Sequence, residues 1–114
     1  MSFLRTTTNR YLEPDTMNPK TIRPWHPGEI IKEDFLADYG LTQYALAKAL
    51  HIPQSRLSSI INGRRSITAD TAARLGRYFG NSAQFWLGLQ SLYDLETLEM
   101  DKIEAEVEPL AVAA

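Results

Sequence analysis

Apolar residues recur every three or four positions along most of this chain, which is the period of an amphipathic helix. The first predicted helix starts after His26, where Pro27 and Gly28 suit a helix entry, and it stops at Gly40. Its core-facing residues are Ile30, Ile31, Phe35 and Leu36. The second predicted helix starts at the N-cap Thr42 and runs to about position 50. Its inward-facing residues are Leu41, Ala45, Leu46 and Ala49.

The helical pattern continues beyond a short corner. A third helix opens at Pro53 as a first-turn residue, runs to about position 62 and stops at Gly63. Its apolar residues are Leu57, Ile60 and Ile61. A fourth helix lies between the N-cap Thr68 and Gly80. Its inner residues are Ala72, Leu75 and Phe79. A last helix follows the N-cap Ser82, and no stretch alternates in the manner of a strand, so the pattern predicts an all-α protein.

The last predicted helix covers residues 83–108 and is more apolar than one flank of a small bundle requires. Its apolar residues include Trp86, Leu89, Leu92, Tyr93 and Leu95. We interpret these side chains as core or dimer seam rather than as a ligand-binding box. A long exposed apolar stripe needs a partner, and a two-fold axis supplies an identical one. The pattern therefore predicts a homodimer that forms through this helix.

The composition narrows the class of protein. A chain of 114 residues fits one domain with a modest core, and the absence of Cys excludes disulfides and thiolate metal sites. Neither His26 nor His51 has a partner at metal-ligand spacing, and no nucleophile triad or phosphate-binding loop is present. We therefore expect no enzymatic activity, metal or cofactor. No apolar run reaches the roughly 20 residues of a membrane helix, and no signal peptide is evident, so we expect a cytoplasmic protein.

The distribution of charge along the chain indicates the kind of partner better than the net charge of −2 does. Residues 20–79 carry nine basic and five acidic side chains, a net charge of +4, whereas residues 80–114 carry one basic and seven acidic side chains, a net charge of −6. Residues 39–69 contain no Asp or Glu but include Lys48, Arg56, Arg64 and Arg65. A helical segment kept free of acids favours an anionic partner, of which duplex DNA is the most plausible.

The third predicted helix has the composition of a helix that reads DNA. Its outward positions are polar and small, which allows close approach to a major groove, while its apolar positions hold it on the core. These outward residues are Gln54, Ser55, Arg56, Ser58 and Ser59. Gln43, at the start of the second helix, is expected near a phosphate and near Gln54. The alternative is that these residues, together with Arg64 and Arg65, are merely solvated surface.

Residues 41–80 resemble the helix-turn-helix of the XRE (Cro/cI-like) family, through LTQYALAKALHI and QSRLSSIINGRRSIT. The flanking segments HPGEI at 26–30 and FWLGLQSLYDL at 85–95 are similar to the HigA/VapI branch, the antidote proteins of toxin–antitoxin pairs. The resemblance covers roughly residues 24–98. It implies a five-helix lambda-repressor-like domain with an extended C-terminal helix. We accordingly divide the chain into an arm (1–24), a DNA-binding domain (25–80) and a dimerisation helix with an acidic tail (81–114).

The resemblance also implies roles for single residues. Gln43 and Gln54 would clamp DNA backbone and base, Ser55 would contact base or phosphate, and Asn62 with the following loop would contact phosphate. Arg56 occupies a variable recognition position, so its base target does not carry over. Pro53 stands where many relatives have Ser, which removes a hydroxyl and a backbone N–H donor.

The leading hypothesis is a sequence-specific repressor that binds a palindromic operator and regulates its own operon as the antitoxin of a type II pair. The first alternative is a stand-alone XRE-family regulator without a toxin. A second is a protein-interaction module that no longer binds DNA, and the acid-free segment argues against it.

The partner that the resemblance implies is a basic toxin of the mRNA endonuclease type. Acidic residues of the tail would steer such a toxin at low salt. They are Glu96, Glu99, Asp101, Glu104 and Glu106. The arm of residues 1–24 is the rival docking site, and the alternative for the tail is that it only raises solubility.

Overall fold

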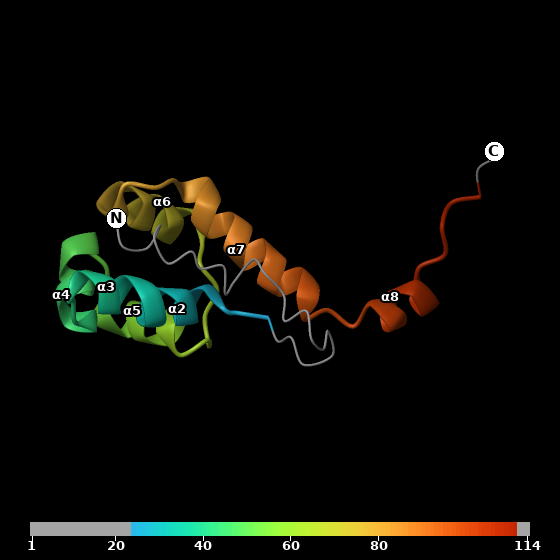
Figure 1. The fold of residues 1–114 in the computed structure, drawn as a ribbon. Helices are drawn as coiled ribbons and strands as arrows, with labels where there is room; N and C mark the ends of the chain where they lie inside the picture. Colours follow the sequence, from blue (N-terminus) through green and yellow to red (C-terminus); the bar gives the residue numbers. More distant parts are fainter. Residues whose placement is uncertain (1–23, 112–114) are drawn as a thin grey trace.

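The computed structural model of the protein describes residues 24–111. All secondary structure within these residues is helical, which confirms the predicted all-α class. Figure 1 shows a body formed by α2 to α7, from which the end of α7 leads away to α8. The predicted arm lies outside the described residues except for Pro24.

The first predicted helix is continuous but changes its winding. It consists of α2 (Pro27–Ile30), the π-helical segment η3 (Ile31–Leu36) and α3 (Ala37–Tyr39), which follow one another without a break. A capping box starts it: the Gly28 N–H donates to His26 Nδ1 (2.9 Å), and the His26 N–H donates to Glu29 Oε1 (3.0 Å). Gly40 ends it with a left-handed φ of 63°.

The helix-turn-helix consists of α4 (Gln43–Leu50) and α5 (Gln54–Ile61). The Thr42 hydroxyl caps α4 by accepting the Ala45 N–H (3.0 Å), as predicted. Pro53 is an extended N-cap with ψ of 142° rather than a first-turn residue, so α5 starts one residue later than expected. The buried side of α4 also differs: Ala47 is buried, whereas Ala49 is exposed.

The last predicted helix is two helices. α6 (Ala69–Phe79) precedes them, and α7 (Ala83–Glu96) and α8 (Met100–Glu106) are separated by residues 97–99. The Thr97 hydroxyl donates to the carbonyl oxygens of Tyr93 (2.9 Å) and Asp94 (3.2 Å), which terminates α7. Every residue from 97 to 111 is exposed, so no packing holds a continuous helix together. None of the described helices is long and apolar enough to span a membrane.

Trp86 of α7 lies at the centre of the core. Its side chain is 0% exposed, its Nε1–H donates to Asn81 Oδ1 (2.8 Å), and its ring centroid lies 5.0 Å from that of Phe35. The prediction that Trp86 joins a dimer seam is therefore wrong, because no part of it remains to contact a second copy. Gly28 brings α2 close to α5: a Cβ at this position would lie 1.8 Å from the Ile60 carbonyl oxygen.

Candidate nucleic-acid interface

The two sides of α5 have opposite character. Its apolar residues Leu57, Ile60 and Ile61 are buried, and both α2 and α4 pack against the helix. Its polar residues keep their surface. Gln54 and Ser55 are exposed in the first turn, while Arg56, Ser58 and Ser59 are partly buried. One side of α5 is therefore anchored in the core, and the other presents polar side chains, as a helix that enters a major groove requires.

The segment that follows α5 is held by its backbone while its arginines point to solvent. Gly63 turns the chain with a φ of 77°, and the Arg64 N–H donates to the Ser59 carbonyl oxygen (2.8 Å). The side chains of Asn62, Arg64 and Arg65 are exposed. Farther along, the Ile67 N–H donates to Gln90 Oε1 (2.8 Å), so α7 anchors the end of this loop.

Gln43 lies at the first position of α4 and is partly buried. Gln54 is likewise the first residue of α5, so a glutamine starts each of the two helices that meet at the corner. His51 forms that corner with a left-handed φ of 58°. Pro53, as the N-cap of α5, provides no side-chain oxygen to the first turn.

His26 lies buried behind the loop, where α2, the loop and α7 meet. Its ring packs edge-on against Tyr93, with centroids 4.9 Å apart. Burial lowers the pKa of His26, while the charges of Glu29 and Asp94 and a hydrogen bond with the Arg65 backbone oppose that shift. The imidazole is thus a structural element that supports the loop.

Arg56 does not project freely from α5. Its Nη1 donates to Asp70 Oδ2 (3.2 Å), and the same oxygen accepts from Arg74 Nε (2.9 Å). Arg74 also donates through Nη1 to the Leu50 carbonyl oxygen (3.0 Å), at the end of α4. The hydrogen bond from Arg74 lowers the pKa of Asp70. The charge of Arg74, and the hydrogen bond and the charge of Arg56, act in the same direction.

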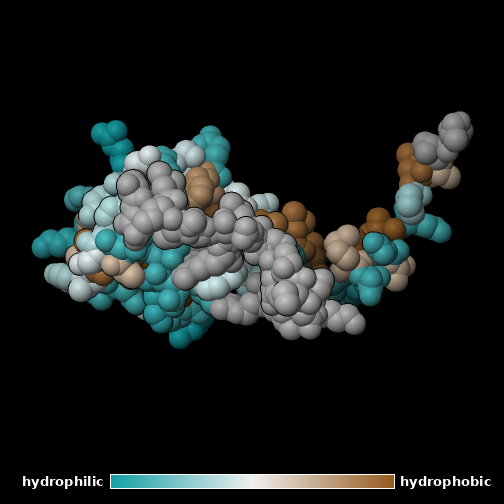
Figure 2. Space-filling model, viewed as in Figure 1, coloured by the Kyte–Doolittle hydropathy of each residue, from teal (hydrophilic) through white to brown (hydrophobic). Residues whose placement is uncertain are grey.

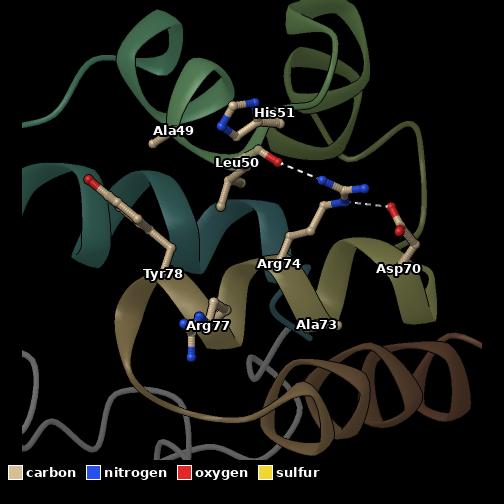
Figure 3. Close-up of a pocket in the computed structure, with 8 residues that line it drawn as sticks. All are labelled: Ala49, Leu50, His51, Asp70, Ala73, Arg74, Arg77 and Tyr78. Carbon is tan, nitrogen blue, oxygen red and sulfur yellow. Dashed lines mark hydrogen bonds and ion pairs between the residues drawn. The ribbon is translucent and has the colours of Figure 1, made fainter.

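Figure 3 shows Arg74 extended across the shallow groove between α4 and α6, with its two contacts drawn. Asp70 lies in the first turn of α6, and the periodicity of the sequence did not predict these contacts. The available signal was that Asp70 is the one acid between Asp38 and Asp94.

The surface at the far end of α7 and on α8 is apolar and acidic. Leu92 and Leu95 are 45% and 59% exposed, whereas Leu89 packs partly against the core. The exposed apolar residues continue with Leu98, Met100, Ile103 and Val107. The five predicted acids of the tail are exposed as well. Figure 2 shows the hydrophobic residues along α7 and α8 beside hydrophilic ones.

Sequence comparison finds related proteins over most of this chain. A family model described as helix-turn-helix matches residues 31–86. The chain is 56% identical over 77 residues to virulence-associated protein I of Dichelobacter nodosus, across 68% of this chain and 71% of that protein. It is 39% identical over 93 residues to antitoxin HigA-1 of Vibrio cholerae, across 80% and 88% of the two chains.

A solved structure of a similar protein contains DNA. It is the antitoxin HigA of Pseudomonas aeruginosa with the higBA promoter, at 47% sequence identity and a TM-score of 0.73. The match covers 78% of this chain and 100% of that chain.

Proposed function

Because this chain belongs to the XRE-type helix-turn-helix family, in the branch that contains the HigA antitoxins, we propose that it is a sequence-specific DNA-binding repressor and an antitoxin. The family is one of DNA-binding regulators and antitoxins. The observation that carries the proposal is the polar side of α5, which is presented from a helix whose apolar side is buried.

The DNA-binding surface that we propose combines α5 with the start of α4 and the following loop. Residues of α5 would meet base edges, and exposed residues of the loop would meet phosphates. The base-reading set is Gln54, Ser55, Arg56, Ser58 and Ser59. The phosphate-contacting set is Gln43, Asn62, Arg64 and Arg65. We assign DNA binding to residues 25–80 and partner binding to residues 81–114.

A single helix-turn-helix buries little surface, so we propose that two copies bind a palindromic operator with half-sites about one helical turn apart. The seam would use the outer part of α7, with the exposed Leu92 and Leu95 and the partly buried Leu89 and Tyr93. Selection of binding sites from random duplex DNA, followed by footprinting, tests this. We expect a two-fold symmetric footprint at the protein's own promoter. An asymmetric footprint over one half-site would contradict the dimer, and selection of no sequence would overturn the repressor.

The antitoxin activity needs a cognate toxin, for which we propose a basic mRNA endonuclease encoded beside this gene. The exposed acids of the last helices, such as Glu104 and Glu106, complement a basic surface. Both proteins would then act in the cytoplasm. Co-expression tests the pairing, since the neighbouring product should arrest growth alone and lose toxicity in the presence of this protein. If the neighbour is harmless alone, or stays toxic in the pair, the protein is a stand-alone repressor.

A further inference from the structure

Asp70 is the one carboxylate between Asp38 and Asp94, within the most basic part of the chain. A negative charge beside a DNA-binding surface weakens the attraction for phosphates. Asp70 is exposed, so neither burial nor core packing explains it. Its place in the first turn of α6 favours an acid through the helix dipole, but this requires no contact with α5.

The contacts of Asp70 connect three helices. Its Oδ2 accepts hydrogen bonds from Arg56 Nη1 of α5 (3.2 Å) and from Arg74 Nε of α6 (2.9 Å). Arg74 in turn holds the last carbonyl of α4, that of Leu50, at 3.0 Å (Figure 3). The carboxylate thus accepts a hydrogen bond from a side chain that is itself linked to α4 and α6, and it accepts a second one from the guanidinium of Arg56.

The contact occupies only one nitrogen of Arg56. With Nη1 bound to Asp70, no hydrogen bond within the described residues uses the edge formed by Nε and Nη2, and the side chain keeps 32% of its surface exposed. That edge carries two parallel N–H donors. Two acceptors with the matching spacing, O6 and N7, lie on guanine in the major groove.

We propose that Asp70 is a positioning residue that holds Arg56 with its free edge toward a guanine of the operator. The inference rests on the proposed DNA binding. A free Arg side chain must be ordered when it binds, which lowers its contribution to recognition, whereas a side chain already held by Asp70 loses less freedom. Asp70 thereby sets how sharply one base pair is read, without touching DNA.

The test compares the wild type with Asp70→Asn, which keeps the size of the side chain and removes its charge. The preferred site is selected from random duplex DNA, and each of its base pairs is then varied while binding is measured at fixed salt. We expect Asp70→Asn to lose about tenfold in discrimination at one G·C pair, the pair at which Arg56→Ala also loses it. The matched control is Asp38→Asn, which removes the same charge from an exposed position on α3. It is expected to keep the wild-type preferences.

A double-mutant cycle separates positioning from a structural role. If Asp70 acts through Arg56, adding Asp70→Asn to Arg56→Ala changes discrimination no further. A thermal unfolding curve of each variant shows that the compared proteins are folded, and Asp70→Ser serves in place of Asp70→Asn if the latter is not. The proposal is overturned if Asp70→Asn keeps the wild-type preference, or if it weakens discrimination at every base pair alike. In those cases the proposed repressor function is unaffected. If the wild type selects no sequence, both the repressor function and the role of Asp70 are contradicted.

Discussion

The α5 helix and the far end of α7 turn opposite chemistry toward solvent. In α5 the apolar residues are buried and the exposed ones are polar or basic. At the end of α7 and on α8, apolar residues such as Leu95 and Ile103 are exposed among acids. Both segments are helical, and both leave one surface without a contact to the body.

The difference shows what each surface requires. Basic and hydrogen-bonding groups are well solvated without a partner, and Lys or Arg side chains that meet phosphates release the counterions of DNA, so the polar side of α5 needs no cover in the free protein and suits DNA. Contact of exposed leucine side chains with water is unfavourable, and the free energy is lowered only when another apolar surface covers them. One surface therefore favours reversible electrostatic binding, and the other favours assembly with a protein.

The largest expected effect separates the two ends of α7 itself. Trp86→Ala removes a fully buried side chain and should lower the free energy of unfolding by about 3–5 kcal/mol. Leu95→Ala, on an exposed side chain of the same helix, should change it by less than about 0.5 kcal/mol at concentrations where the protein is monomeric. Urea unfolding measures both. Equal losses would mean that the end of α7 packs on the body.

A charge placed in the exposed apolar stripe tests whether a second copy covers it. Leu92→Glu should weaken the dimer by about 2–5 kcal/mol, because the new carboxylate would be buried without a partner. Sedimentation velocity over a range of concentrations gives the dissociation constant. Ser91→Glu is the control, since it adds the same charge at an exposed polar position of α7. A Leu92→Glu protein that remains dimeric would place the seam elsewhere.

On the α5 side, substitutions should divide into base-reading and phosphate-contacting effects. Arg56→Ala or Gln54→Ala should cost about 1–3 kcal/mol at the base pairs read and relax the preference there. Arg64→Ala or Arg65→Ala should weaken binding to all sequences and reduce the salt slope by about one unit. Fluorescence anisotropy at several salt concentrations distinguishes them. Unchanged affinity and preference for Arg56→Ala would remove α5 as the reading helix.

The smallest expected effect concerns His26, which contacts both Tyr93 of α7 and the backbone of Arg65 in the loop after α5. Because burial lowers its pKa below 6.5, the unfolded chain takes up the proton first, and stability should fall as the pH drops below about 6.5. Urea midpoints between about pH 7.5 and pH 5.5 measure this slope. His26→Asn, which keeps a capping oxygen, should flatten it. His51→Asn retains His26 and should leave the slope in place, and an unchanged slope in His26→Asn would assign the effect to other groups.

Local signals predicted the boundaries of most helices because the chemistry that starts and stops a helix is short in range. Thr42, Thr68 and Ser82 each accept a backbone N–H three residues ahead, as their positions indicated. Gly63 and Gly80 adopt the left-handed φ that an L side chain avoids. The buried stripe of α5 followed from the period of its apolar residues.

The sequence by itself therefore determined the all-helical class, the N-caps Thr42, Thr68 and Ser82, and the polar side of α5. Only the tertiary structure decided that Trp86 is core rather than seam, and that Ala47 rather than Ala49 faces inward. It also decided the contact between Arg56 and Asp70, which are 14 residues apart. Periodicity reports which side of a helix is apolar, but it does not report which neighbour covers that side or which distant charge meets a given side chain. These depend on how the helices pack, and packing is a property of the whole body rather than of any one segment.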